Sequence, residues 1–252
     1  MRQLTEYFGQ NIKDKRIVIT GGTTGIGKAT ADLLVSLGGS VLIFGRDKKD
    51  FNNAFDDIKK QFPDCELYGI PADVTKKEDI AAILKIVDKQ LGGIDILINN
   101  AALPADGITD GSFEDWHYII DTNIMGYLTF CKEAVSRMST QKSGHIINIG
   151  SMSAESRSPE STIYVTTKSA IRGFSTSLRK EVNPLGIKVS LIEPGAVTSD
   201  MQPGTRKEHQ KKIDKLEMLE ADDIAMSILF CLSQPKRCDI VTMQIRPHLQ
   251  KI

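Results

Sequence analysis

A tyrosine and a lysine one helical turn apart are the residues best suited to chemistry in this sequence. Tyr164 and Lys168 stand at positions i and i+4 of a segment with helical apolar spacing, so they share one face of a predicted helix. A tyrosine hydroxyl has a reference pKa of about 10, and a neighbouring ammonium group favours the phenolate and lowers that pKa. Ser151, at the end of a predicted strand upstream, can hold a carbonyl oxygen against the tyrosine. A half-buried tyrosine beside a solvated lysine is the alternative reading of the pair.

A glycine-rich turn near the N-terminus is suited to binding phosphates. It joins a predicted strand over residues 17–19 to a predicted helix over residues 25–37, and its glycines are Gly21, Gly25 and Gly27. Glycine adopts backbone angles closed to other residues, and a helix N-terminus offers unpaired N–H groups and a positive dipole end to a pyrophosphate. The spacing is not the commonest dinucleotide fingerprint, so an ordinary strand–helix turn remains an alternative.

Apolar segments alternate with helical patterns along the whole chain. The predicted strands cover residues 17–19, 41–44, 66–72, 94–98, 145–149, 187–192 and 240–245. Predicted helices separate them, at about residues 25–37, 49–61, 75–91, 112–138, 162–183 and 221–233, with capping boxes at Thr75–Glu78 and Ser112–Asp115. We therefore expect an α/β fold, a doubly wound parallel seven-stranded sheet, in a single domain over residues 1–252. A polar, lysine-rich flap is expected at about residues 198–220.

The composition excludes several classes of function. Lys plus Arg and Asp plus Glu both total 32 of the 252 residues, and a neutral chain lacks the basic excess of a nucleic-acid or anionic-membrane surface. No run approaches the ~18 to 20 apolar residues of a membrane span, and the N-terminal stretch has no signal-peptide core. The four cysteines and four histidines have neither disulfide-framework nor metal-ligand spacing. We predict a cytoplasmic protein with reduced thiols and no metal.

Taken together, the motifs resemble the short-chain dehydrogenase/reductase family. They occur in the order and rough spacing of that family over about residues 14–247: TGGTTGIG at 20–27, Asn99-Asn100-Ala101, Asn123, Ser151, Tyr164-x-x-x-Lys168 and Pro194-Gly195. The resemblance implies a Rossmann fold and an NAD(P)-dependent oxidoreductase. Residues 150–201 and the ending SQPKRCDIVTMQIRP are similar to NADP-dependent dehydrogenases of short 3-hydroxy acids such as serine. One departure is Ala102, where the family has glycine; its methyl group could crowd the cofactor or shift the loop.

The resemblance also implies roles for the matching positions. Tyr164 would exchange a proton with the substrate oxygen, and Lys168 would hold the nicotinamide ribose and lower the tyrosine pKa. Ser151 would orient the substrate, and Asn123 would hold a water in a proton relay. The implied cofactor contacts are Gly21, Thr23, Thr24 and Ile26 at the pyrophosphate, Asp73 and Val74 at the adenine, Asn100 near the adenosine, and Val197 or Thr198 at the nicotinamide amide.

Arg46 predicts the choice of cofactor. In dinucleotide folds the exit of the second strand meets the adenosine ribose, where a carboxylate suits a free 2′-hydroxyl and an arginine can pair with a 2′-phosphate. Here Gly45 stands where the acid usually is, and Arg46 follows. We therefore predict NADP(H), with NAD(H) as the alternative because a shifted turn would put Asp47 on the ribose. Alternatively, Arg46 is an exposed arginine on the loop that enters the next helix and does not select the cofactor.

The sequence gives fewer indications of the substrate and of the oligomeric state. We expect a small-molecule carbonyl or alcohol in a pocket built from residues 103–107, 152–160 and 198–220, where Arg157 either pairs with a substrate carboxylate or is solvated. Apolar residues on the helices predicted at 112–138 and 162–183 indicate a homodimer or homotetramer. The competing function is a catalytically weak NAD(P)-binding sensor or scaffold with the same fold. A serine hydrolase is disfavoured because Ser151 lies outside a Gly-x-Ser-x-Gly motif.

Overall fold

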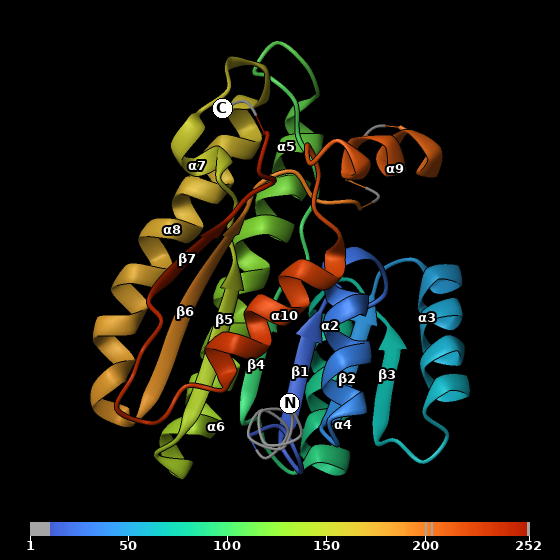
Figure 1. Cartoon of the computed structure of the whole chain (residues 1–252). Coiled ribbons are helices and arrows are strands. Elements are labelled where there is room, and N and C mark those ends of the chain that lie inside the picture. The colour runs from blue at the N-terminus through green and yellow to red at the C-terminus, as the bar shows by residue number, and fades with distance from the viewer. Residues whose placement is uncertain (1–10, 200, 203, 251–252) are drawn as a thin grey trace.

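The apolar runs of the sequence form the strands of one parallel sheet, as predicted. In the computed structural model, which describes residues 11–199, 201–202 and 204–250, seven strands pair in the order β3-β2-β1-β4-β5-β6-β7 (Figure 1). They are β1 (Arg16–Thr20), β2 (Ser40–Gly45), β3 (Leu67–Pro71), β4 (Ile96–Asn99), β5 (Gly144–Ile149), β6 (Ile187–Pro194) and β7 (Thr242–Ile245). Every pairing is parallel. The doubly wound architecture is therefore confirmed.

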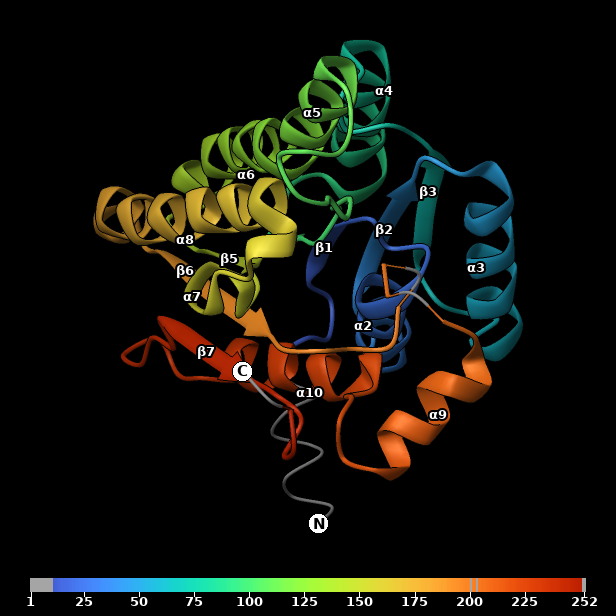
Figure 2. The same cartoon turned by 90° about the horizontal axis from the view of Figure 1, so that it is seen from above.

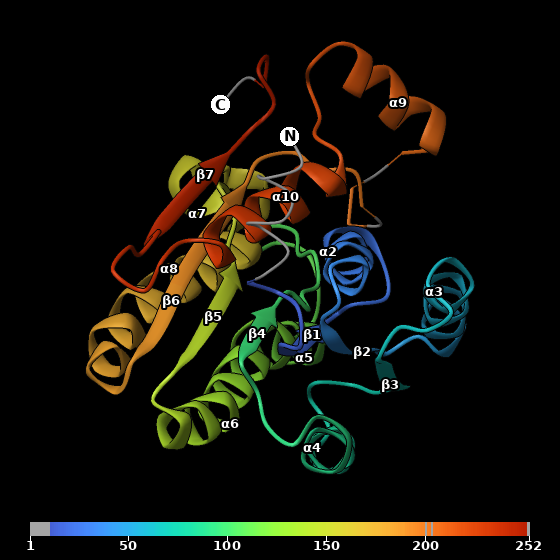
Figure 3. The ribbon, with the colours of Figure 1, turned by 60° about the horizontal axis from the view of Figure 1, so that its bottom comes forward.

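Helices cover both faces of the sheet (Figures 2 and 3). The α-helices of the described residues are α2 (Gly25–Ser36), α3 (Lys48–Gln61), α4 (Lys77–Ile86), α5 (Phe113–Ile120), α6 (Gly126–Gln141), α7 (Ser153–Ser156), α8 (Thr162–Val182), α9 (Arg206–Asp214) and α10 (Ala221–Leu232), of which α7 and α9 lie beyond the carboxyl ends of the strands (Figure 1). Side chains alternate along a strand, so Ile17 and Ile19 pack in the core with α2, α3 and α10, whereas Val18 packs in the core with α4, α6 and α8. Both faces of each central strand are buried, which explains their continuous apolar character.

The strand order reverses beside β1. The chain runs from β1 outward through β2 to β3, then crosses to β4 on the other side of β1. The carboxyl ends of β1 and β4 thus lie next to each other, with Thr20 opposite Asn99. Ligands of such sheets bind outside the carboxyl ends at this switch point. The glycine turn after β1 and the loop after β4 are therefore placed where a nucleotide would bind.

One of the two predicted capping boxes is wrong. Ser112 and Asp115 form the reciprocal hydrogen bonds at the start of α5. Thr75 does not cap α4, which begins at Lys77 with Lys76 as its N-cap; the Thr75 hydroxyl instead donates to Oδ1 of Asp73 at 2.8 Å. The helix thus starts one residue later than a cap by Thr75 requires.

The long helix predicted over residues 112–138 contains a π-helical segment. α5 continues into the π-helical turn Asp121–Met125 and then into α6. A π-helical turn carries an extra residue and is frequent at functional sites. Asn123 lies in this turn and is buried. The sequence pattern, which only distinguishes helix from strand, could not reveal this local widening.

The flap predicted at residues 198–220 contains one helix among its described residues, α9. It returns to the body of the protein through a bridge between Val197 and Leu219. Residues 200 and 203 lie outside the described residues, and so do residues 1–10, for which we predict no signal peptide. In the described part of the chain no helix has the length and apolarity to cross a membrane, and no group of side chains could hold a metal ion.

His145 predicts part of the pH dependence of stability. It is buried in β5, and burial lowers its pKa from 6.5 to about 3. Its Nε2 lies 2.9 Å from the Ser190 hydroxyl, which itself donates to the Ile240 carbonyl. Between about pH 3 and pH 6.5 the unfolded chain binds more protons at this group than the folded chain does. The free energy of unfolding should therefore fall as the pH falls through that window.

We expect His145 to account for about 2 kcal/mol of the stability lost between about pH 7.5 and about pH 5. Urea unfolding of the parent and of His145→Gln at both pH values measures this share. The variant should show the smaller loss because glutamine does not titrate. Equal losses in the two proteins would show that the histidine does not control this part of the pH dependence.

Candidate active site

Two adjoining cavities open at the carboxyl ends of the strands. The tyrosine cavity has a volume of about 430 Å³, and Ser151, Tyr164 and Lys168 line it together. The glycine-turn cavity has a volume of about 370 Å³ and is lined by the turn after β1 and the exits of β2 and β3. Both cavities are bordered by Ile26, Asn100, Ala102, Pro104, Ser199 and Met201. The two cavities thus form neighbouring parts of one site.

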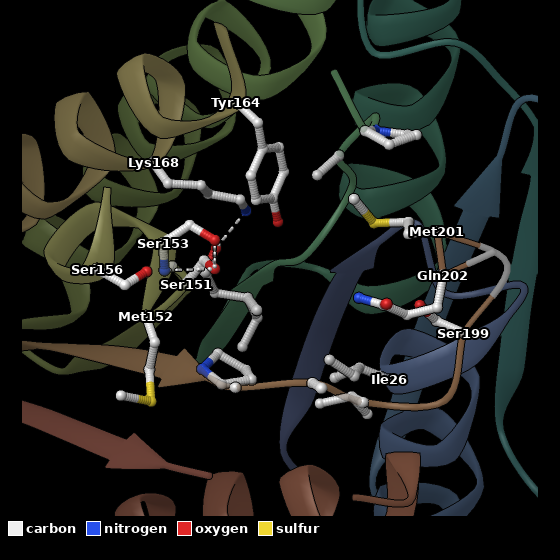
Figure 4. A pocket seen from close by; sticks show the side chains of 18 of the residues that line it. Ile26, Ser151, Met152, Ser153, Ser156, Tyr164, Lys168, Ser199, Met201 and Gln202 are labelled. Carbon is white, nitrogen blue, oxygen red and sulfur yellow. Dashed lines mark hydrogen bonds between the residues drawn. The ribbon is translucent and has the colours of Figure 1, made fainter. Parts of the chain in front are cut away.

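The predicted tyrosine–lysine pair lies on one face of α8 (Figure 4). Lys168 is buried, with 2% of its surface exposed, and its Nζ donates to the Ile149 carbonyl at 2.9 Å. The same Nζ lies 5.6 Å from the centre of the Tyr164 ring. The end of β5 therefore fixes the lysine beside the tyrosine, and the predicted proximity of Ser151, Tyr164 and Lys168 is observed.

Burial dominates the protonation of this pair. It raises the pKa of Tyr164 to about 12, although the Ser151 hydroxyl lowers it in part. It lowers the pKa of Lys168 to about 8. The expected lowering of the tyrosine pKa by Lys168 is therefore not seen, because the desolvation of the buried phenolate is the largest contribution and raises the pKa. Near neutral pH the tyrosine carries a hydroxyl proton that it can donate.

Ser151 is oriented by a neighbour that the sequence analysis did not single out. Its Oγ donates to Oγ of Ser153 at 3.0 Å and accepts from the Ser153 amide at 3.1 Å (Figure 4). Ser153 is the first residue of α7 and also lines the tyrosine cavity. A second serine hydroxyl next to Ser151 is thus available to a ligand in this cavity.

Asn123 fastens the loop that separates the two cavities. Its Oδ1 accepts from the Leu103 amide at 2.7 Å, and its Nδ2 donates to the Leu103 carbonyl at 2.9 Å and to Oγ1 of Thr167 at 3.2 Å. Both amide protons are used, so only a lone pair of Oδ1 remains for a water. The side chain ties the loop after β4 to α8 from within the π-helical turn.

The glycine turn has the close packing that a phosphate-binding turn needs. Gly21 and Gly25 have φ angles of +62° and +50°, which other residues rarely adopt. A Cβ on Gly27 would lie 2.0 Å from the Gly21 carbonyl oxygen, so only glycine lets α2 approach the turn this closely. Thr24, the N-cap of α2, makes no side-chain cap bond. The turn therefore fits a nucleotide pyrophosphate at the N-terminus of α2.

Asn100 holds the turn from the neighbouring strand. Its Nδ2 donates to the carbonyls of Thr20 and Gly21, at 3.2 and 2.8 Å. The Thr20 hydroxyl in turn accepts from the amides of Asn100 and Ala101, both at 2.9 Å. Ala102, where the sequence departs from the family pattern, borders both cavities.

At the exit of β2, Arg46 follows a glycine, Gly45, that packs closely against Thr23. Arg46 lines the glycine-turn cavity, whereas a Cβ on Gly45 would lie 2.4 Å from Oγ1 of Thr23. Asp47 is the N-cap of α3, and its Oδ1 accepts from the amides of Lys49 and Asp50 at 2.8 and 2.9 Å. Both Arg46 and Asp47 line the glycine-turn cavity, but Oδ1 of Asp47 is engaged in the helix cap.

The other predicted cofactor positions divide between the cavities. Thr23, Thr24, Asp73 and Val74 line the glycine-turn cavity, as predicted. Val197 lines the tyrosine cavity. Thr198 borders neither of the two; its amide donates to the Leu219 carbonyl at 2.9 Å at the base of the flap.

Of the two interpretations of Arg157, the structure favours the solvated one, because Arg157 is exposed and does not line the tyrosine cavity. Arg157 follows α7 and borders a separate groove on the outer side of α8, with Arg172 and Lys180. Its backbone is left-handed, with a φ of +53°. Segments 103–107, 152–160 and 198–220 all contribute to that cavity, but its lining also includes Gln250, which no motif indicated.

Comparisons with known proteins agree with this geometry. A family model described as short chain dehydrogenase matches residues 15–210. An uncharacterized oxidoreductase of Staphylococcus aureus (strain MRSA252) is 37% identical over 241 residues, which cover 94% of this chain and 98% of that protein. An uncharacterized oxidoreductase of Staphylococcus epidermidis is 36% identical over 237 residues, with the same two shares.

Solved structures show the same fold. A 3-ketoacyl-(acyl-carrier-protein) reductase from Brucella melitensis, in complex with NADH, superposes with a TM-score of 0.83 at 22% identity, covering 94% of this chain and 98% of that one. A short-chain type dehydrogenase/reductase from Mycobacterium marinum also has a TM-score of 0.83, at 25% identity, covering 94% and 95% of the two chains.

Proposed function

The chain belongs to the short-chain dehydrogenase/reductase family of NAD(P)-dependent oxidoreductases, and from this premise we propose that it transfers a hydride between NADP(H) and a small carbonyl compound or secondary alcohol. The observation that carries the proposal is the meeting of Ser151, Tyr164 and Lys168 in one cavity beside the glycine turn. The glycine-turn cavity would hold the adenosine and pyrophosphate, and the tyrosine cavity the reacting carbon.

The protein side chains handle the substrate oxygen and its proton, whereas the bound nicotinamide supplies or accepts the hydride. Tyr164 donates its hydroxyl proton to the carbonyl oxygen as that oxygen gains negative charge, and takes a proton back in the oxidation direction. Ser151 turns its hydroxyl from Ser153 to the same oxygen, while the Ser153 amide keeps the Ser151 oxygen in place. Two donors then converge on the developing charge.

Lys168 and Asn123 support this proton transfer. Lys168 keeps a positive charge near neutral pH, where it favours the phenolate that Tyr164 becomes and can donate to the ribose hydroxyls. Asn123 holds the loop at Leu103 and retains one Oδ1 lone pair for a water at the end of a proton relay. The family resemblance suggests both roles, and the observed contacts of the two side chains leave room for them.

The pocket favours an uncharged polar substrate over the 3-hydroxy acid that the narrower resemblance predicts. Besides Tyr164 and Lys168, the only ionisable side chain among its described lining residues is Asp106. A carboxylate would therefore rely on neutral donors such as Ser153, Ser156 and Gln202 (Figure 4). We propose a small neutral carbonyl or alcohol as the substrate, with a 3-hydroxy acid as the second candidate.

A panel of carbonyl compounds and alcohols tests the proposal. Each is assayed with NADPH or NADP⁺ and with NADH or NAD⁺, and the absorbance of the reduced nicotinamide is followed. We expect turnover of at least one neutral carbonyl, faster with NADPH than with NADH. A protein that binds the cofactor tightly and turns over no member of the panel would instead be the NAD(P)-binding sensor or scaffold.

We also propose that the chain forms a homodimer or homotetramer. Large apolar side chains are exposed on α5 and the π-helical turn at Phe113, Ile120 and Met125, and on α10 at Met226 and Phe230. Such faces are commonly covered by a second copy in symmetric assemblies. The predicted contribution of α8 has less support, since no large apolar residue of that helix is among the exposed ones. Light scattering should give a multiple of 27.8 kDa; a monomer at micromolar concentration would contradict the proposal.

A further inference from the structure

Tyr118 connects Arg46 and Asp73, two of the charged residues that line the glycine-turn cavity. Its hydroxyl accepts a hydrogen bond from Nη1 of Arg46 at 2.8 Å and donates to Oδ2 of Asp73 at 2.7 Å. The Arg46 guanidinium carbon lies 5.4 Å from the centre of the tyrosine ring, within the range of a cation–π contact. All three residues line the cavity. The tyrosine thus stands between the arginine and the carboxylate.

The chemistry of the three groups fixes the direction of these bonds. A guanidinium has no acceptor and an ionised carboxylate has no donor, so the tyrosine proton must point to Asp73 and an oxygen lone pair to Arg46. Asp73 is itself held, because its Oδ1 accepts from the amide and hydroxyl of Thr75 at 2.9 and 2.8 Å. The turn after β3 therefore orients Tyr118, which orients Arg46.

No second side chain holds the guanidinium among the residues that the structure describes. Arg46 itself is exposed, and the hydrogen bond to Tyr118 is its one side-chain bond there. The adjacent Asp47 is engaged as the cap of α3. A free arginine side chain must lose rotamer freedom to bind a ligand, and a contact that limits this freedom beforehand strengthens binding. Tyr118 is the contact that does so here.

We propose that Tyr118 is the positioning residue for Arg46 and so sets the preference for a cofactor with a 2′-phosphate. The inference rests on the proposed use of NADP(H). With one guanidinium proton bound to Tyr118, four of the five N–H groups of Arg46 remain for a phosphate. The hydroxyl also stands between Arg46 and Asp73, so it keeps the guanidinium available to the ligand and away from a direct ion pair with this carboxylate. Tyr118 acts through Arg46 and need not touch the phosphate.

The test is Tyr118→Phe with the dissociation constants of NADPH and NADH measured by calorimetry. Phenylalanine keeps the ring over which Arg46 lies and removes only the hydroxyl. We expect the dissociation constant for NADPH to rise about threefold to tenfold, the effect of one lost hydrogen bond. The constant for NADH, which has no 2′-phosphate, should change by less than about twofold.

Arg46→Ala provides the matched background. Without the guanidinium, Tyr118→Phe should change NADPH binding by less than about twofold, because the two substitutions act on one interaction. An equal loss of affinity for both cofactors would mean that Tyr118 is structural and would overturn the inference, as would unchanged NADPH binding in the single variant. A parent protein that binds NADH more tightly than NADPH would instead overturn the proposed cofactor preference itself.

Discussion

The Tyr164→Phe variant is expected to lose about 10²- to 10⁴-fold in kcat, the usual contribution of a general acid–base group. In the proposed mechanism the hydroxyl is the proton donor to the substrate oxygen, and Tyr164 lines the tyrosine cavity with Ser151 and Lys168. The ring remains in phenylalanine, so packing on α8 and cofactor binding should change little. Steady-state rates with a substrate from the panel measure the loss, and cofactor titration confirms that the site is intact.

Tyr68→Phe is the matched control for that variant. Tyr68 lies in β3 and borders neither cavity, so the same chemical change there should leave kcat near that of the parent. Turnover by Tyr164→Phe close to the parent rate would remove Tyr164 from the mechanism. A large loss in both variants would point to an effect of tyrosine removal on the fold, which unfolding curves would show.

The Arg46→Asp substitution is expected to shift the ratio of kcat/KM for NADPH over NADH by about 10²-fold or more towards NADH. Charge-assisted hydrogen bonds to a phosphate are worth about 1.5 to 3 kcal/mol, and a carboxylate at this place also repels the 2′-phosphate. An acidic side chain at position 45 would meet Thr23, because a Cβ on Gly45 would lie 2.4 Å from Oγ1 of Thr23. Selectivity should therefore depend on the residue at position 46.

Lys48→Asp makes the same change of charge two residues away. Lys48 is exposed and does not line the glycine-turn cavity, so its substitution should move the ratio far less than Arg46→Asp does. Comparable shifts in the two variants would mean that only the overall local charge matters. An unmoved ratio in Arg46→Asp, or a parent that prefers NADH, would show that Arg46 is not the selector.

The fold was accessible from sequence because its strongest signals are local. Each central strand is a continuous apolar run between turn residues, and α8 was predicted at residues 162–183 against the observed Thr162–Val182. Thr75 and the π-helical turn at Asp121–Met125 show the limit of such signals. In the first place the helix starts one residue later than the cap pattern indicates, and in the second the apolar spacing does not distinguish a π-helical turn from an α-helical one.

The site was predictable where residues lie a fixed distance apart on one element. Tyr164 and Lys168 share a helix face by their spacing alone. The contact of Tyr118 with Arg46 joins residues 72 positions apart, and periodicity carries no information on such a pair. The two interpretations of Arg157 could not be separated from sequence, because no motif marks which groove its loop borders. The pKa of Tyr164 depends on burial, which only the packed structure reveals.

Transfer of deuterium tests the central claim most directly. NADPH carrying deuterium at the transferring position of the nicotinamide is incubated with the protein and the best carbonyl substrate of the panel, and the alcohol product is analysed by mass spectrometry. If the chain is an NADP(H)-dependent oxidoreductase acting at the tyrosine cavity, the alcohol carries one deuterium on the former carbonyl carbon, and Tyr164→Phe forms it far more slowly. An alcohol without deuterium, or equal formation by the two proteins, would contradict the account.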